Sequence, residues 1–319
     1  MKQGDCAMDV RVNGVRGVNL AVRDLEQSVR FYTQAWGLKV ASRGDDGVVY
    51  LRASGPEHHV LSLREAPRSQ FLGVSLSAKN KFAVDALHAR ARGFGADVVT
   101  APQALDESGG GGYGFSFRTP DGIMQTVSCD LRQHRQGAED KRAPHKFSHA
   151  VIRAANYEML GSFYMDLLGM KFSDETDGIT FLRCSPDHHS VALAKVDGPG
   201  LHHMAFEVPS LDGLLYAAGH MRDNGYNIEH GPGRHSGPGN NVYTFFIDPN
   251  GFAIEYTTEM EQVDDATYPK RSAQWWRENR PRQGHCAWGI FDGPSPLLRK
   301  ARNGHLIEEL NERALAEHV

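Results

Sequence analysis

The chain has no run of lysine or arginine longer than two residues, and its formal net charge is −4 over 319 residues. Because duplex nucleic acid is bound by clustered positive charge that displaces counterions, the sequence argues against a nucleic-acid partner. No apolar stretch approaches the roughly 20 residues that a membrane span needs, and the N-terminus lacks the apolar core of a signal peptide. We therefore expect a cytoplasmic protein with no membrane partner.

Cysteine is scarce, and the four cysteines, at positions 6, 129, 184 and 286, form no CxxC pair. This spacing argues against a thiolate zinc site and against a disulfide framework, so we expect reduced thiols. The length is sufficient for two domains of ordinary size, each with its own core.

The sequence does contain an internal repeat. Three motifs occur twice, in the same order and between 129 and 132 residues apart: RFYTQAWGLKV at 30–40 and SFYMDLLGMKF at 162–172, PEHH at 56–59 and PDHH at 186–189, and PDG at 120–122 and PNG at 249–251. This regularity indicates two copies of one domain, which we assign to residues 14–130 and 145–258. We call them the first and the second repeat.

Each repeat shows the same order of expected elements, a strand, a helix and three strands, followed by the same series again. The pattern predicts an α+β fold of tandem βαβββ units, in which each domain forms a concave, barrel-like mixed sheet with helices outside. The polar segment 131–144 is typical of a linker, and residues 1–13 form an N-terminal tail. Residues 259–319 are expected to pack on the second repeat, with a final helix at about 296–316.

The two repeats differ at three positions that carry chemistry. Residues of the second repeat align with residues of another kind in the first: His149 with Asn19, His203 with Gly73, and Glu255 with Thr126. All three fall on expected strands. A single such residue on a strand is most often only hydrogen-bonded or solvated, but three differences confined to one repeat favour a shared purpose.

Strand alternation helps to orient these side chains. Met204 and Phe206 share one face of their strand, so His203 takes the other face, and His202 is assigned to the helix-packed side or an edge. Glu255 likewise opposes its apolar neighbours. Two imidazoles and one carboxylate that converge suit a divalent first-row metal and leave three adjacent coordination positions open, as in non-haem Fe(II) sites that handle dioxygen.

The second repeat resembles the type I extradiol catechol dioxygenases of the vicinal-oxygen-chelate superfamily, whose members are built from βαβββ modules. The resemblance covers residues 14–290, and five motifs carry it: FSH at 147–149, DHHSVA at 187–192, LHHMAF at 201–206, GRH at 233–235, and DPNG at 248–251 followed by Glu255. It implies ring cleavage of a catecholic substrate by dioxygen, in the degradation of aromatic compounds.

The resemblance also implies roles for individual residues. His149, His203 and Glu255 would be the ligands of Fe(II), with Mn(II) as the alternative metal because the ligand set scarcely separates the two. His189 would be the acid-base residue beside the oxygen site, since a neutral imidazole can accept and return a proton at cellular pH. His235, in a glycine-rich loop, would hydrogen-bond the substrate and product oxygens.

One position departs from the family pattern. Many members carry a tyrosine ten residues before the glutamate ligand, where it hydrogen-bonds the substrate hydroxyl, but this chain has Phe245 there. Tyr243 lies two residues earlier on the same strand face, so we count Tyr243, Phe245 and His235 as candidate substrate contacts. Arg153 and Arg183 are candidates for meeting an anionic substituent, although arginines near strand edges are more often exposed.

Two other functions fit the same fold. One is a different metal-dependent enzyme of this superfamily, such as an isomerase, lyase or hydrolase, which would consume no dioxygen. The other is a metal-free binding protein of the bleomycin-resistance kind, which would have no use for three ligands in one repeat only. We expect the protein to form a homo-oligomer.

Overall fold

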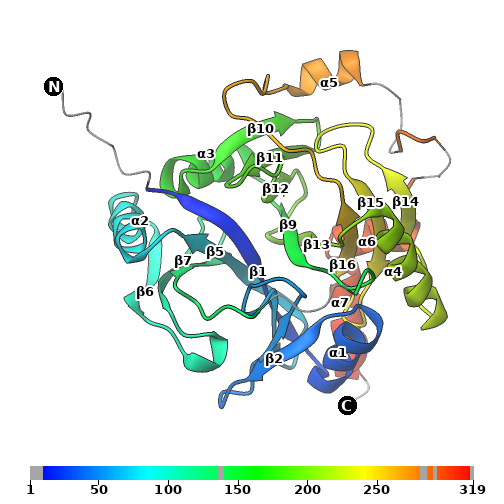
Figure 1. The fold of residues 1–319 in the computed structure, drawn as a ribbon, viewed down its shortest axis with the longest axis horizontal. Coiled ribbons are helices and arrows are strands. Elements are labelled where there is room, and N and C mark those ends of the chain that lie inside the picture. Colours follow the sequence, from blue (N-terminus) through cyan, green and yellow to red (C-terminus); the bar gives the residue numbers. More distant parts are fainter. Residues whose placement is uncertain (1–9, 136–139, 281–285, 290–292, 317–319) are drawn as a thin grey trace.

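The computed structural model describes residues 10–135, 140–280, 286–289 and 293–316 (Figure 1). The first repeat consists of β1 (Val12–Val22), α1 (Leu25–Arg30), a π-helical turn η1 (Phe31–Ala35), β2 (Lys39–Arg43), β3 (Val49–Arg52), β4 (Leu61–Glu65), β5 (Gln70–Ala78), α2 (Lys81–Gly93), β6 (Asp97–Ala104), a short 3-10 turn η2 (Glu107–Gly109), β7 (Tyr113–Arg118) and β8 (Met124–Cys129). Among the described residues, no helix is long and apolar enough to cross a membrane.

The second repeat copies this order. It consists of β9 (Lys146–Arg153), α3 (Tyr157–Leu168), β10 (Lys171–Glu175), β11 (Ile179–Arg183), β12 (Val191–Ala194), β13 (Gly200–Glu207), α4 (Leu211–Asp223), β14 (His230–Arg234), β15 (Val242–Ile247) and β16 (Ala253–Thr258). The C-terminal tail adds α5 (Ala273–Asn279), α6 (Pro296–Arg302) and α7 (His305–Ala316).

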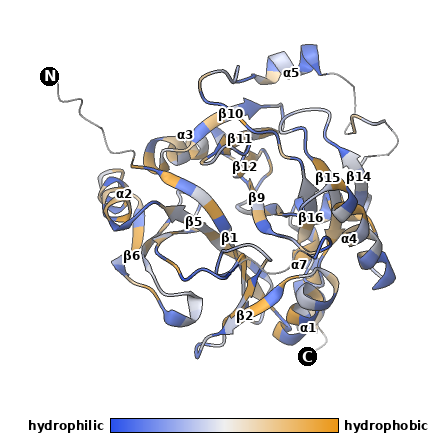
Figure 2. Ribbon diagram, in the orientation of Figure 1, coloured by the Kyte–Doolittle hydropathy of each residue, from blue (hydrophilic) through white to orange (hydrophobic). Residues whose placement is uncertain are grey.

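Each repeat forms one eight-stranded mixed sheet. The strand orders are β2-β3-β4-β1-β5-β8-β7-β6 and β10-β11-β12-β9-β13-β16-β15-β14, so the two sheets match strand for strand. The predicted α+β fold of tandem βαβββ units is confirmed. The sheets are open rather than closed into barrels, since β2 and β6 are the edges of one and β10 and β14 the edges of the other. Hydrophobic and hydrophilic residues are interspersed along β1 (Figure 2).

Local sequence signals account for the ends of several helices. Helix α3 begins after Asn156, whose side chain accepts a hydrogen bond from the Met159 amide, and ends at Gly169 in the left-handed conformation (φ +70°). The single final helix predicted at 296–316 was wrong, because Gly304 (φ +81°) divides it into α6 and α7. A side chain at Gly304 would also lie 2.4 Å from a guanidinium nitrogen of Arg153.

The domain boundaries at 1–13, 131–144 and 259–319 remain predictions, and residues 1–9, 136–139, 281–285, 290–292 and 317–319 lie outside the described part of the chain. Of the cysteines, Cys6 is among those residues. Cys129, Cys184 and Cys286 are buried, and no disulfide joins any of these three described cysteines.

The first helical segment of the first repeat packs on the second repeat. Trp36, which follows η1, is fully buried and stacks on Tyr256 of β16 with ring centroids 3.7 Å apart. The Tyr256 hydroxyl donates to the Trp36 carbonyl at 2.8 Å, and the Tyr32 hydroxyl donates to Asp248 at 2.7 Å. The two repeats therefore share one hydrophobic core.

The first helix of the second repeat, α3, packs on the first repeat in the same way. Phe163 of α3 packs on Phe117 of β7, and the Arg90 guanidinium on α2 donates to the Leu167 carbonyl at 3.0 Å. Each repeat thus contributes its first helix to the packing of the other.

Replacing Trp36 with alanine should lower the free energy of unfolding by about 3 to 5 kcal/mol, because it removes a large ring from a core that the two repeats share. Phe82→Ala on α2 is the control, since this ring is 50% exposed and its loss should change the unfolding free energy by less than about 0.5 kcal/mol. Urea unfolding followed by circular dichroism measures both. Equal losses in the two variants would contradict the shared core.

Candidate metal centre

Three adjacent strands bring the predicted ligands to one face of the second sheet. Strand β13 lies between β9 and β16, and its Ala205 pairs with His149 on one side and with Glu255 on the other. His203 lies two residues before Ala205. Because Ala205 has only a methyl side chain, space remains between the histidines and the carboxylate.

The three side chains converge on one point. The Nε2 atoms of His149 and His203 lie 3.5 and 3.2 Å from Oε2 of Glu255, and one ligand atom from each residue lies within 4.8 Å of the other two. His149 is 2% exposed, His203 7% and Glu255 0%. This arrangement provides one oxygen and two nitrogen ligands to a single ion.

The hydrogen bonds of the glutamate leave one oxygen without a donor. Asn241 donates to Oε1 of Glu255 at 3.3 Å, whereas the buried Oε2 accepts no hydrogen bond from any described residue. A buried carboxylate oxygen without a donor is strongly unfavourable unless a cation compensates its charge. A divalent cation bound at the convergence point would do so.

In both histidines, Nε2 is the ring nitrogen that faces the convergence point. Nδ1 of His149 lies 3.1 Å from the Ser148 hydroxyl, and Nδ1 of His203 lies 2.7 Å from Nδ1 of His202, so Nε2 of each ring remains for a metal. Burial lowers the pKa of His203 well below its ordinary value, and the neighbouring His202 and Arg302 add to the effect. A neutral imidazole is the form that binds metal. The residues therefore fit a divalent first-row ion.

A cavity of about 440 Å³ opens in front of these residues. His189, His235 and Phe245, predicted from the sequence, all line it. The His189 ring lies 4.3 Å from the His149 ring, and burial, followed by the nearby imidazoles, lowers the pKa of His189 well below its ordinary value. The half-buried His235 stacks on Tyr243 with centroids 4.2 Å apart.

Tyr243 is not among the described residues that line the cavity. Its hydroxyl lies 3.1 Å from Nε2 of His230, and His230 and His235 both line the cavity. Phe245 pairs with Glu255 across β15 and β16, and its ring packs on His203 at 5.3 Å. Only Phe245 of these two therefore presents its ring to the cavity.

The assignment of His202 to the helix side or an edge was wrong, because this residue lines the cavity beside His203. The pairing of β13 with β9 skips a residue between Leu201 and His203, which is a β-bulge at His202. A bulge breaks the alternation of strand faces and turns two successive side chains to the same side.

Sequence reasoning missed the groups that the C-terminal tail supplies. Arg302 ends α6, which packs on β13, β15 and β16, and its guanidinium carbon lies 4.2 Å from the Phe245 ring centroid. Burial lowers the pKa of Arg302 to about 10, so the group remains cationic at neutral pH. Arg280 lines the same cavity. The comparison of the two repeats could not reveal these arginines, since both lie in the C-terminal tail, which has no counterpart in the repeated pattern.

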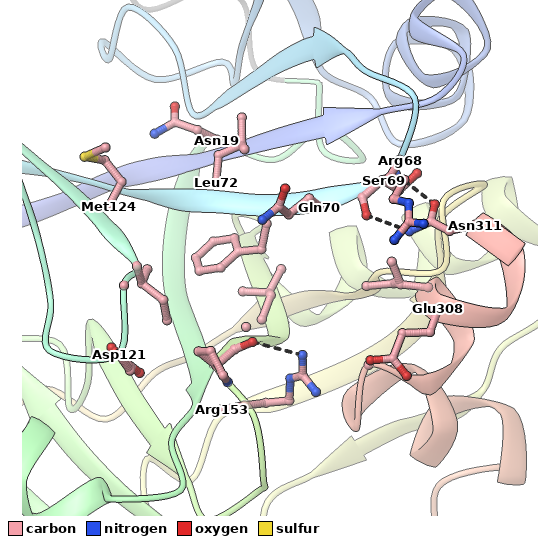
Figure 3. A pocket seen from close by; sticks show the side chains of 18 of the residues that line it. Asn19, Arg68, Ser69, Gln70, Leu72, Asp121, Met124, Arg153, Glu308 and Asn311 are labelled. Carbon is pink, nitrogen blue, oxygen red and sulfur yellow. Dashed lines mark hydrogen bonds between the residues drawn. The ribbon is translucent and has the colours of Figure 1, made fainter.

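The two arginines that the sequence offered for an anionic substituent lie elsewhere. Arg183 is paired with Asp265 and donates to the Phe172 carbonyl. Arg153 lines a larger cavity of about 790 Å³ between the repeats and α7. Figure 3 shows Arg153 and Glu308 on one side of that cavity, across from Asn19 and Met124 on the other.

The first repeat lacks a metal site at the corresponding positions. Asn19 accepts a hydrogen bond from Ser62 at 2.6 Å and donates to Ser75 at 3.3 Å, and the Thr126 hydroxyl lies 3.0 Å from that of Ser116. The hydrogen bonds of these neutral side chains are made with other neutral side chains, and no carboxylate is present. The three sequence differences between the repeats therefore place a buried negative charge in the second repeat and none at the matching position of the first.

Comparisons with known proteins agree with this picture. Residues 14–126 and 146–256 match the family described as Glyoxalase/Bleomycin resistance protein/Dioxygenase superfamily. The crystal structure of the Mn(II)-bound glyoxalase from Novosphingobium aromaticivorans is 35% identical, covers 90% of this chain and 94% of its own, and superimposes with a TM-score of 0.82.

Two curated proteins match over most of their length. Metapyrocatechase 2 of Cupriavidus necator is 26% identical over 276 residues, which are 79% of this chain and 82% of the relative. The manganese-dependent 2,3-dihydroxybiphenyl 1,2-dioxygenase of Geobacillus genomosp. 3 is 24% identical over 298 residues, which are 85% of this chain and 92% of the relative.

Replacing His149 with alanine should reduce bound metal from about one ion per chain to less than about a tenth, because a site with three protein ligands loses one of them. Asn19→Ala at the matching position of the first repeat is the control and should retain the metal. Elemental analysis after desalting measures the content. The chelator EDTA should lower the melting temperature of the wild type and of the control but not of His149→Ala, since only a protein that binds metal is stabilised by it. Full metal content in His149→Ala would contradict the site.

Proposed function

The chain belongs to the Glyoxalase/Bleomycin resistance protein/Dioxygenase superfamily, and we propose that it is a metal-dependent extradiol dioxygenase that cleaves a catecholic ring with dioxygen. The observation that carries the proposal is the buried Oε2 of Glu255, which has no donor among the described residues and faces two imidazole nitrogens at the wall of a cavity. The dioxygenase relatives that match over most of their length support it. The reaction belongs to the degradation of aromatic compounds.

We propose Fe(II) as the metal, with Mn(II) as the second possibility. His149, His203 and Glu255 would hold the ion and leave adjacent positions for a chelating catechol and for dioxygen. The bound ion would supply the Lewis acidity and the electron-transfer path that join the two substrates. Manganese is named for one dioxygenase relative, and the ligand set fits either ion.

The remaining steps depend on the protein's own side chains. His189, which lines the cavity next to His149, accepts a proton from the substrate hydroxyl and returns it when the O–O bond breaks. His235 hydrogen-bonds the substrate oxygens from the loop between β14 and β15. Phe245 provides an apolar wall for the ring, and the Arg302 guanidinium behind it supplies positive charge where many relatives carry a phenol.

A second candidate function is a metal-dependent reaction without dioxygen, such as an isomerisation, lysis or hydrolysis. Two observations favour it. A solved structure 35% identical to this chain is that of a Mn(II)-bound glyoxalase, and Phe245 lacks the phenolic donor that is common among the dioxygenases.

Three further expectations remain predictions from the sequence. They are the cytoplasmic location, the assembly of the chain into a homo-oligomer and the absence of a nucleic-acid partner. Net charge and composition support the last of these.

An oxygen-uptake screen separates the two functions. The protein is reconstituted without air with Fe(II) or with Mn(II), and substituted catechols are then added in an oxygen electrode. We expect uptake of about one dioxygen for each ring cleaved, together with the yellow absorbance of a ring-opened semialdehyde. Absence of uptake with either metal and with every catechol would overturn the dioxygenase and favour the second function.

Replacing His189 with phenylalanine should leave the metal content unchanged and slow turnover about 10²- to 10⁴-fold, because it removes the group that carries the proton. His59→Phe, at the matching position of the first repeat, is the control and should leave turnover within about threefold of the wild type. Steady-state oxygen uptake measures both variants. Undiminished turnover in His189→Phe would remove this residue from the reaction.

A further inference from the structure

A chain of three buried polar side chains runs from the interior of the second repeat to the metal cavity. Oδ2 of Asp174 lies 3.2 Å from Nε2 of His188, and Nδ1 of His188 lies 3.1 Å from Nδ1 of His189. Asp174 and His188 are 0% exposed and His189 is 4% exposed. No other described residue hydrogen-bonds the ring of His189, so its Nε2 is left for a ligand in the cavity.

We propose that Asp174 acts through His188 to fix the proton of neutral His189 on Nδ1, which leaves Nε2 as the nitrogen that accepts a proton from the substrate. Asp174 and His188 are positioning residues in this scheme, and its catalytic meaning rests on the proposed function. The scheme concerns which nitrogen of the neutral ring carries hydrogen.

The assignment follows from the donors and acceptors. A carboxylate can only accept hydrogen bonds, so the hydrogen between Asp174 and His188 belongs to Nε2 of His188. In the neutral form of His188, the hydrogen on Nε2 leaves a lone pair on Nδ1. The hydrogen between the two imidazoles therefore belongs to Nδ1 of His189, and Nε2 of that ring carries a lone pair. A histidine held by a carboxylate in this way is a recurrent device for setting a catalytic base.

The first repeat provides a natural comparison. It keeps the imidazole pair, with Nδ1 of His58 at 3.1 Å from Nδ1 of His59. The position that matches Asp174 is Ser42, since each lies just after the bulge of its strand, and the Ser42 hydroxyl donates to the Ser108 carbonyl instead. The carboxylate next to the imidazole pair is thus present only in the second repeat, which also contains the three candidate metal ligands.

The C-terminal tail fixes the carboxylate in place. The backbone amide of Arg271 donates to Oδ1 of Asp174 at 2.7 Å, and the Tyr268 hydroxyl donates to Oδ2 at 3.0 Å. The Arg271 guanidinium, 3.8 Å from Oδ2, adds positive charge beside it. The amide of His188 donates to the Glu261 carbonyl of the tail at 2.8 Å, so both members of the chain are anchored from the same side.

Asp174→Asn is the informative substitution because its direction can be predicted. The Arg271 amide can only donate and requires an acceptor at the Oδ1 position, whereas the Tyr268 hydroxyl at Oδ2 can rotate and accept. The new NH₂ group therefore takes the place of Oδ2 and faces Nε2 of His188 as a donor. Each hydrogen along the chain then reverses, and the hydrogen of His189 moves from Nδ1 to Nε2. The ring could then no longer accept a proton from the substrate.

Nitrogen NMR of ¹⁵N-histidine-labelled, full-length protein loaded with diamagnetic Zn(II) tests the tautomer directly. We expect the wild type to carry the His189 hydrogen on Nδ1, Asp174→Asn to carry it on Nε2, and Ser42→Ala, at the matching position of the first repeat, to resemble the wild type. A hydrogen on Nε2 in the wild type, or an unchanged tautomer in Asp174→Asn, would overturn the proposal. If Asp174→Asn does not fold, His188→Phe replaces it and should leave His189 with a mixture of tautomers; a single Nδ1 tautomer there would overturn it equally.

Kinetics of the Fe(II)-loaded protein provide the second measurement. We expect Asp174→Asn to lower kcat about 10- to 100-fold with KM and metal content within about twofold of the wild type, and the first-repeat control Ser42→Ala to keep kcat within about threefold. Equal losses in the two variants would show that Asp174 has only a structural role. If the wild type cleaves no catechol, the proposed function fails, but the NMR result still decides the hydrogen-bond chain.

Discussion

The charge of one buried glutamate is the constraint on which the second repeat depends. Glu255 is surrounded by β9, β13 and β15, and only one of its two oxygens has a donor from the described residues. A carboxylate in that position would destabilise the fold unless a cation compensated its charge, so a metal bound at the candidate centre would be linked to the folding of this region. The neutral side chains at the same positions of the first repeat carry no such requirement, so the same scaffold needs no cation there.

The C-terminal tail contributes side chains around the candidate metal ligands, which themselves lie on strands. It supplies Arg302 behind Phe245, and it holds Asp174 through Arg271 and Tyr268. One of these contacts lies at Phe245 and the other next to His188, the neighbour of His189. The repeats therefore provide the ligands, whereas the tail provides the surroundings that adjust their chemistry. Figure 1 shows α5 and α6 on separate sides of the second repeat.

Much of the fold, and the three residues that converge at the candidate metal centre, could be predicted because duplication compares each position with a second copy. The order of elements along the chain follows from repeated motifs and alternation, and the candidate ligands follow from the three positions at which the copies differ. Alternation failed at His202, because a bulge depends on how β13 pairs with β9 rather than on its own residues. Arg302, Arg280 and Tyr268 could not be found in this way, since the tail has no counterpart within the repeats and its contacts are set by tertiary packing.

The reciprocal helix packing between the repeats has a consequence for how such a protein can change over time. Trp36 and Tyr32 complete the core of the second repeat, and Phe163 completes that of the first. Deleting the copy without metal ligands would expose the apolar surface of its neighbour to water. Selection for a stably folded protein therefore retains that half of the duplication, even though the candidate ligands all lie in the other.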